Sequence, residues 1–293
     1  MRVLIIGCGY VGLPLGAELA RRGHEVVGVR RSPEGAEELL AAGITPVVAD
    51  VTRPETFAPL SGAFDWVVNA VSSTKGGASE YRAVYLEGTR HLLDWLAAHP
   101  PQKYVHLSST SVYGQMDGEV VNEIAAAAPT GETSQLLVAT EQLLLTAASE
   151  REFPAVILRA AGIYGPTRGH LFQQFLRNEA RIAGDGTRVM NMIHRDDLVG
   201  AIIAALERGR RGEIYNAADD ESVSQLEFFR WLAAKLGKPL PPFATEVENA
   251  ARKRGLTNKR VANDKLKTEL GYAFKYPTFR EGYASEIARM RLL

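Results

Sequence analysis

The sequence predicts an α/β fold built on a doubly wound parallel sheet, and three observations support this prediction. Short apolar runs alternate with amphipathic segments through the first 160 residues, which is the pattern of parallel strands joined by helical crossovers. The first apolar run, residues 3–6, leads through a glycine-rich turn into a helical segment. Near residue 166 the pattern changes to short helices and polar loops, so we expect a smaller C-terminal α/β lobe.

The expected elements follow from the spacing of apolar residues, because short apolar runs suit strands that are buried on both faces. Strands are expected at residues 3–6, 25–29, 45–49, 66–70, 103–108 and 155–159. Helices are expected at residues 10–22, 33–42, 79–98, 132–149, 171–182, 196–208 and 224–236. We predict a first domain over residues 1–167, to which residues 190–216 return. Residues 168–189 and 217–293 then form the smaller lobe over the carboxyl ends of the strands, where ligands bind in open α/β sheets.

The first strand leads into the turn Gly7-Cys8-Gly9-Tyr10-Val11-Gly12, which has the spacing GxGxxG. Gly7 permits a tight turn, Gly9 lets the backbone approach a pyrophosphate, and Gly12 lets the helix pack close to the strand. The helix N-terminus would offer free N–H groups and a partial positive charge to the phosphates. This context predicts a dinucleotide site that includes Gly7, Gly9, Tyr10, Val11 and Gly12. The alternative is a glycine-rich turn that only packs tightly.

The end of the second strand bears on which dinucleotide is bound. Arg30 and Arg31 stand where an acidic residue would accept from the ribose 2′-hydroxyl of NAD, and an arginine there would accommodate a 2′-phosphate. The two arginines therefore favour NADP(H) over NAD(H), although Glu34 follows a few residues later. The alternative is that both arginines are solvated surface residues.

Two later strand ends complete the predicted cofactor site. Asp50 and Val51 follow the third strand, where a carboxylate can accept from an adenine amino group or can instead stabilise a turn. Asn69, Ala70 and Val71 follow at the end of the fourth strand. We expect small residues there to leave room beside a ribose.

Composition limits the function classes further. The 293 residues include 34 basic and 34 acidic side chains, so net charge gives no general attraction to nucleic acid or membrane. The single cysteine, Cys8, fits a reducing compartment and a cytoplasmic location. We expect no membrane span, since no run of about 18 apolar residues occurs, and no metal site. Residues 250–293 hold eleven Lys/Arg against four Asp/Glu, which predicts either a solvated basic face or a pocket for a phosphorylated substrate.

Besides the glycine-rich turn, five segments resemble the short-chain dehydrogenase/reductase superfamily, in its extended epimerase/dehydratase-like branch. They are residues 107–114, 158–166, 190–197, 214–217 and 270–272, in this order. The resemblance spans nearly the whole chain. It implies a Rossmann-type cofactor domain and hydride transfer between a nicotinamide and a carbon that bears oxygen.

The resemblance also implies which residues do the chemistry. In the family, a tyrosine gives or takes the proton of the substrate oxygen, and a lysine four residues later lowers the pKa of that tyrosine and holds the nicotinamide ribose. A serine or threonine orients the substrate oxygen, and this role falls on Ser109, with Ser108 and Ser111 as further candidates. The tyrosine position is Thr133 and the lysine position is Leu137. The pair is absent from the region, because residues 114–163 hold no tyrosine and residues 104–234 no lysine.

This loss has a chemical consequence. A threonine hydroxyl is a far weaker acid than a phenol, whose pKa is about 10, and a leucine can neither donate a hydrogen bond nor lower a pKa by its charge. A reaction of the family type would be slow unless another group stands in. Tyr113, Tyr164, Tyr85 and His194 are the candidates, and His194 has the most suitable ordinary pKa. The predicted catalytic set is Ser109, Thr133, Tyr113 and His194.

Three hypotheses of function remain. The first is an NADP(H)-dependent oxidoreductase or epimerase/dehydratase-like enzyme that acts on a nucleotide sugar or another small carbonyl compound. Its substrate phosphate would be held by Arg159, Arg168, Arg188 and Arg195, since guanidinium binds phosphate bidentately. The second is a catalytically silent cofactor-binding sensor or partner protein, and the third is a homologue that binds little. The helices at 79–98 and 132–149 carry many apolar residues, and the resemblance implies that this pair forms a homodimer. The alternative is ordinary packing of both helices on the sheet.

Overall fold

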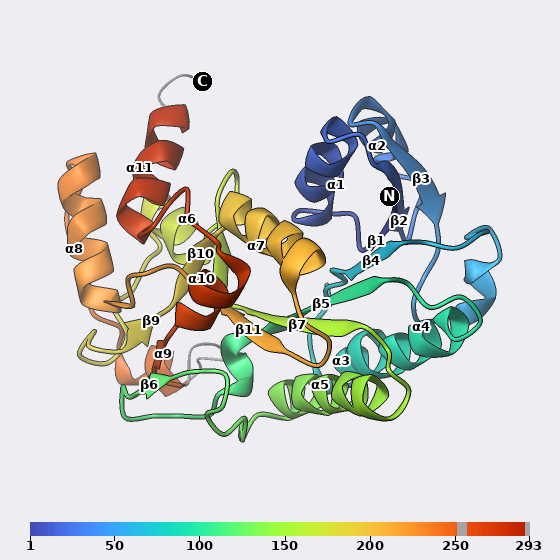
Figure 1. The fold of residues 1–293 in the computed structure, drawn as a ribbon. Helices are drawn as coiled ribbons and strands as arrows, with labels where there is room; N and C mark the ends of the chain where they lie inside the picture. The colour runs from blue at the N-terminus through green and yellow to red at the C-terminus, as the bar shows by residue number, and fades with distance from the viewer. Residues whose placement is uncertain (251–256, 291–293) are drawn as a thin grey trace.

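The computed structural model describes residues 1–250 and 257–290, and its centre is a seven-stranded parallel sheet (Figure 1). The strand order is β11-β7-β5-β4-β1-β2-β3, and every neighbouring pair is parallel. The strands are β1 (Arg2–Ile6), β2 (Glu25–Arg30), β3 (Ile44–Val48), β4 (Trp66–Asn69), β5 (Lys103–Ser109), β7 (Ala155–Ala160) and β11 (Ile214–Ala217). The predicted Rossmann-type doubly wound sheet is therefore confirmed.

Helices cover both faces of this sheet, so that successive residues of a strand are buried in different layers. Val3 and Ile5 of β1 pack with one set of helices, and Leu4 and Ile6 pack with the other, as the alternation of side chains along a strand requires. The first layer contains α1 (Gly12–Arg21), α2 (Ala36–Ala41) and α7 (Arg195–Arg208). The second contains α3 (Ala78–Tyr81), α4 (Gly88–Leu96) and α5 (Glu132–Glu150).

A lobe with an aromatic core lies at one end of the sheet. Figure 1 shows helices α8 (Gln225–Leu236) and α11 (Phe279–Met290) at the opposite end of the molecule from α1 and α2. Phe228 and Phe279 are fully or almost fully buried in this core. The other elements that contribute to this core are β8 (Gly162–Tyr164), α6 (His170–Leu176), β9 (Val189–Met190), β10 (Met192–His194) and β12 (Val223–Ser224). Residues of η3 (Thr110–Val112), β6 (Val120–Val121), β13 (Arg260–Val261) and α10 (Asp264–Leu270) pack instead with the first helix layer. The short helix α9 (Glu246–Ala250) follows α8 along the chain. The predicted domain boundaries stay a prediction.

The structure refines several predicted elements. All six predicted strands are present to within one residue at each end, and β11 adds an edge strand that was not predicted. The helix predicted at 33–42 begins only at Ala36, because Gly35 has a left-handed φ of 77°. The helix predicted at 171–182 ends at Leu176, just before Asn178, which has a φ of 61°. The helix predicted at 79–98 contains a π-helical segment, Arg82–Glu87.

The sequence predicts neither a membrane span nor a metal site. Within residues 1–250 and 257–290, no helix is long and apolar enough to cross a membrane. The same residues contain no cluster of three or more His, Cys, Asp or Glu side chains that could hold a metal ion. Four of the eleven basic residues counted at 250–293, namely Arg252, Lys253, Arg254 and Arg291, lie outside the described residues.

Candidate functional site

A long groove runs along the carboxyl ends of the central strands and continues into the C-terminal lobe. Its volume is about 1990 Å³, whereas pockets for a single small ligand usually measure about 300–1,000 Å³. The groove therefore has room for a dinucleotide and a second ligand. Of the predicted site residues, those that line it are Gly7, Gly9, Tyr10, Val11, Arg30, Arg31, Asp50, Val51, Ala70, Val71, Ser109 and Thr133. The further candidates that line it are Ser108, Ser111, Tyr85, Tyr164, Arg168 and Arg188.

The three glycines of the turn differ in what surrounds them. Gly7 has a φ of 86°, and a Cβ added there would lie 2.7 Å from the backbone of Ala70. A Cβ on Gly12 would lie 2.7 Å from the carbonyl oxygen of Gly7, so Gly12 serves close packing outside the groove. A Cβ on Gly9 would meet nothing within 4 Å. The open side of Gly9 faces space in the groove lining, which fits the close approach of a pyrophosphate.

The two arginines after β2 have different surroundings. The Nε–H of Arg30 donates to the carbonyl oxygen of Cys8 (2.7 Å), and its Nη2 donates to Glu38 Oε2 (2.9 Å). Arg31 is exposed and donates to Thr74 Oγ1 over 3.3 Å. Arg30 thus ties the glycine-rich turn to the start of α2, whereas Arg31 is the more available of the two for an additional anion.

The predicted residues after β3 and β4 are only partly in the groove. Asp50 lines it, but one carboxylate oxygen already accepts from the backbone N–H (2.9 Å) and hydroxyl (2.8 Å) of Thr52, as a turn-stabilising aspartate does. Asn69 is buried outside the groove lining and donates to the hydroxyl of Tyr104 (3.0 Å). Its amide therefore supports the strand end from inside, and the contact of Asn69 with the cofactor stays a prediction.

Ser109 and Thr133 both line the groove. Ser109 ends β5, and its Oγ accepts from the N–H of Ser111 (3.1 Å), which holds the turn η3 in place. Thr133 lies in the first turn of α5. One turn further on, Leu137 is 4% exposed and packs in the core, so an apolar side chain fills the position where the resemblance implies a lysine.

The structure removes Tyr113 and Arg159 from the predicted site. Tyr113 is fully buried outside the groove lining; its hydroxyl donates to Asn216 Oδ1 and accepts from Arg159 Nη1, both over 2.8 Å. Arg159 pairs with Glu141 (2.6 Å), which also accepts from the hydroxyl of Ser108 (2.5 Å). Glu141 thus neutralises Arg159, and the hydroxyl of Tyr113 is used inside the protein, so the structure does not bring these two side chains together with Ser109 and Thr133 in the groove.

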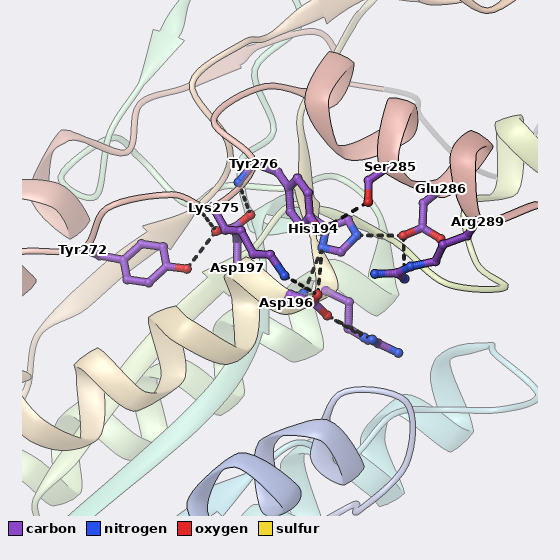
Figure 2. A network of polar contacts seen from close by, with 10 residues as sticks. His194, Asp196, Asp197, Tyr272, Lys275, Tyr276, Ser285, Glu286 and Arg289 are labelled. Carbon is purple, nitrogen blue, oxygen red and sulfur yellow. Dashed lines mark hydrogen bonds and ion pairs between the residues drawn. The ribbon is translucent and has the colours of Figure 1, made fainter. Parts of the chain in front are cut away.

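His194 is also placed away from the groove. It is fully buried at the start of α7, where its Nδ1 accepts from the N–H of Asp196 (3.1 Å), and its Nε2 lies 3.2 Å from Glu286 Oε1 (Figure 2). Burial lowers its pKa, although Glu286 and Asp196 act in the opposite direction. Figure 2 shows the ring between α7 and α11. Its contacts connect α7 to α11, so the structure does not bring this ring together with the predicted catalytic residues that line the groove.

Three further tyrosines line the groove, namely Tyr85, Tyr164 and Tyr10, and none of them is a stronger acid than an ordinary phenol. Tyr85 accepts from the N–H of Ser73 (3.2 Å), and Tyr164 stacks on Tyr283 with ring centroids 4.2 Å apart. The ring of Tyr10 lies near two guanidinium groups, at 4.7 Å from Arg168 and 5.3 Å from Arg195. Burial raises the pKa of all three phenols, and that of Tyr10 reaches about 12. None of these three is therefore tuned as the family tyrosine is.

The groove also contains a buried lysine, Lys259, that was not identified as a site residue from the sequence. Lys259 is 5% exposed and lines the groove from the C-terminal lobe. Its Nζ donates to the carbonyl oxygen of Tyr113 (2.9 Å) and to Thr257 Oγ1 (2.7 Å). Burial, with a smaller contribution from Arg188, lowers its pKa to about 8. The basic excess at residues 250–293 was the only signal, and it did not identify the residue.

Known proteins resemble this chain in sequence and in fold. The model of the NAD dependent epimerase/dehydratase family matches residues 3–218. The chain is 28% identical to Protein YeeZ of Escherichia coli (strain K12), over 94% of this chain and 96% of that protein. It is 29% identical to the 3-diazoavenalumate denitrifying reductase of a Streptomyces species, over 98% and 100%. The dTDP-glucose 4,6-dehydratase DesIV of Streptomyces venezuelae, solved with NAD, has the same fold with a TM-score of 0.86 at 22% identity, over 100% and 97%.

Proposed function

Because this chain belongs to the NAD-dependent epimerase/dehydratase family, we propose that it is an NADP(H)-dependent oxidoreductase or epimerase/dehydratase-like enzyme. Its substrate is a nucleotide sugar or another small carbonyl compound. One observation carries the proposal: a single groove is lined by Gly9, whose open side has no neighbour within 4 Å, and also by Ser109 and Thr133. Cofactor and substrate can therefore lie in one continuous space.

The residues at the strand ends fit a nicotinamide dinucleotide. The glycine-rich turn and the α1 N-terminus hold the pyrophosphate, and the residues after β3 and β4 border the adenosine. Arg31, supported by Arg30, is proposed to bind a 2′-phosphate, which favours NADP(H). When bound, the nicotinamide supplies a hydride acceptor or donor.

The chain's own contribution at the reacting carbon comes from hydroxyl groups. Ser109 and Thr133 hydrogen-bond the substrate oxygen and fix its position, as hydroxyls that both donate and accept can do. Neither hydroxyl is a strong acid, so we expect modest turnover compared with an enzyme that has a tuned phenol. General acid–base catalysis is typically worth about 10²–10⁴ in rate.

A second candidate function rests on Leu137. A buried apolar side chain at this position keeps the cofactor groove and removes the charge that activates a catalytic phenol. The same chain could then act as a catalytically silent NADP(H)-binding sensor or partner protein. The enzyme would convert a substrate and the sensor or partner protein would not, whereas both would bind the cofactor.

The test combines cofactor titration with a turnover assay. NADPH and NADH binding are followed by nicotinamide fluorescence, and NADPH oxidation or sugar conversion is measured on UDP-glucose, dTDP-glucose and small aldehydes and ketones. We expect tight NADPH binding and turnover of at least one compound. Loss of a hydrogen bond to the reacting oxygen in Ser109→Ala or Thr133→Val should lower turnover roughly 10- to 100-fold with NADPH affinity unchanged.

The control is Ser149→Ala, at the far end of α5, where the hydroxyl donates to the carbonyl oxygen of Thr146 in the same helix. Tight NADPH binding without turnover across the panel would favour the sensor function. Absence of binding of either nucleotide would contradict both functions.

We also propose a homodimer through α4 and α5. Most of the apolar residues that suggested this pairing are buried within one chain, including Leu92, Leu93 and Leu144, whereas Leu143 and Leu145 are only partly buried. A dimer would cover the latter two. A monomeric mass in sedimentation at micromolar concentration would count against it. The single buried cysteine, Cys8, fits the proposed cytoplasmic location.

A further inference from the structure

Lys259 carries a buried positive charge that no described carboxylate neutralises. Its Nζ bonds to two uncharged acceptors, the carbonyl oxygen of Tyr113 and the hydroxyl of Thr257. No ion pair joins it to an acidic side chain of residues 1–250 and 257–290. The undescribed residues 251–256 include no Asp or Glu in their sequence.

Such an arrangement is costly for a folded protein. An ammonium loses its hydration on burial, and buried charges are ordinarily paired or bound to a counter-ion. The two acceptors of Lys259 would be satisfied equally well by a neutral donor of similar length. The charge itself therefore requires a reason outside the folding of this chain.

The groove supplies the place for a counter-charge. An ammonium has three N–H donors, and the two described bonds of Lys259 leave one for a ligand. Arg188 lines the same part of the groove and adds positive potential at Lys259. The charged groups that line the whole groove are Arg30, Arg31, Lys75, Arg168, Arg181, Arg188 and Lys259, against Asp50, Glu179 and Glu248.

We propose that Lys259 is a substrate-recognition residue that binds an anionic group, phosphoryl or carboxylate, of the second ligand in the groove. This inference rests on the proposed function, since it assigns the class of substrate that the enzyme accepts: a carbonyl or sugar compound with a negative charge. The backbone of Lys259 is fixed for this purpose, because Asn191 Nδ2 donates to its carbonyl oxygen (2.9 Å) and Asn191 Oδ1 accepts from the N–H of Val261 (2.8 Å).

The test measures anion binding by calorimetry on the full chain with saturating NADP⁺, so that the glycine-rich turn is already filled. Inorganic pyrophosphate and malonate are the probes, because the first presents phosphoryl groups and the second carboxylates. Lys259→Gln keeps a donor for the two internal acceptors and removes the charge. Lys267→Gln is the matched control, since Lys267 pairs with Asp220 outside the groove lining.

We expect at least one probe to bind the wild-type protein, with affinity lowered about tenfold or more in Lys259→Gln and unchanged in Lys267→Gln. Binding of pyrophosphate alone indicates that the site prefers a phosphoryl group, and binding of malonate alone indicates that it prefers a carboxylate. Binding of both indicates that the site recognises negative charge without distinguishing the two groups. Absence of binding of both probes, or equal affinity in wild type and Lys259→Gln, would overturn the inference.

A second measurement needs no substitution. The affinity of the wild-type protein for malonate, or for pyrophosphate if only that binds, should fall as the pH rises beyond about 8, since Nζ then loses its proton. A profile without this fall between pH 7 and 9.5 would overturn the inference. NADPH titration of the same samples separates the two proposals. If NADPH binds and the anions do not, only this inference fails. If NADPH does not bind, the proposed function fails. The inference is then tested by comparing the anion affinities of the wild-type protein and Lys259→Gln without cofactor.

Discussion

The Nε–H of Arg30 donates to the carbonyl oxygen of Cys8 over 2.7 Å, so the end of β2 is bonded to the glycine-rich turn. The sequence places Arg30 and Arg31 together as candidates for a 2′-phosphate, and the structure separates their surroundings. Arg30 holds the turn and the start of α2, whereas Arg31 is exposed at the groove.

Substitution of the two arginines should therefore have different effects on cofactor choice. We expect Arg31→Ala to weaken NADPH binding about tenfold and to leave NADH binding unchanged, because only NADPH has a 2′-phosphate. Arg30→Ala should weaken both, since the turn loses its support. Fluorescence titration of both nucleotides measures this, with the exposed Arg53→Ala as control. If the wild-type protein binds NADPH and NADH equally well, and Arg31→Ala changes neither affinity, then Arg31 is a surface residue with no role in cofactor choice.

The glycines of the turn should separate folding from cofactor binding. Gly9→Ala adds a Cβ that meets no protein atom within 4 Å, so we expect normal stability and much weaker NADPH binding. Gly7→Ala combines a φ of 86° with a contact of 2.7 Å to Ala70, so we expect it to lower the free energy of unfolding by more than about 1 kcal/mol. Urea denaturation and NADPH titration distinguish the two. Wild-type NADPH affinity in a well-folded Gly9→Ala would contradict the placement of the pyrophosphate.

The pair between Glu141 and Arg159 should be essential for stability. Glu141→Gln keeps the shape of the side chain but leaves the Arg159 guanidinium, which is 3% exposed, without its counter-charge. Breaking a buried pair in this way costs about 3–5 kcal/mol, measurable as a lower urea midpoint. The exposed pair of Glu152 and Arg211 is the control, and Glu152→Gln should cost less than about 1 kcal/mol. Similar losses in the two variants would show that burial does not set the cost.

His106 should make stability depend on pH in the acid range. It is almost fully buried in β5 with no partner for either ring nitrogen among the described residues, and burial lowers its pKa from 6.5 to about 4. Below pH 6.5 the unfolded chain binds a proton that the folded chain does not, so stability falls as the pH falls. This group alone should cost about 1 kcal/mol between pH 6.5 and 5.5.

The corresponding variant is His106→Leu, which should flatten the dependence of the free energy of unfolding on pH over this interval. His99→Leu is the control, because His99 is exposed after α4. An unchanged slope in His106→Leu, measured by urea denaturation at several pH values, would show that other groups cause the acid sensitivity.

The sequence predicted those parts of the molecule that depend on local periodicity. Apolar runs identify the six predicted strands, and the spacing of the glycines identifies the turn. Strand β11 was not predicted because polar Asn216 interrupts its short apolar run. A four-residue segment at the edge of a sheet is recognised by its pairing with β7, which is a tertiary property.

The site was predicted less completely, for a related reason. Polar residues at strand ends mark either a site or a buried network, and the sequence does not distinguish the two for Tyr113 or His194. The distinction depends on partners such as Asn216 and Glu286, which lie 103 and 92 residues away along the chain. Lys259 was missed because its burial is created by the C-terminal lobe, which folds back on the segment after β5.

The bond between Tyr113 and Asn216 also has a consequence for synthesis on the ribosome. Helix α5 and strands β5 and β7 are complete by residue 160, but the network that joins them lacks its last acceptor until residue 216 has emerged. Until then β7 also has an open edge, which β11 later covers. A nascent chain released before this point would therefore expose an unpaired strand, the kind of edge that favours association between chains.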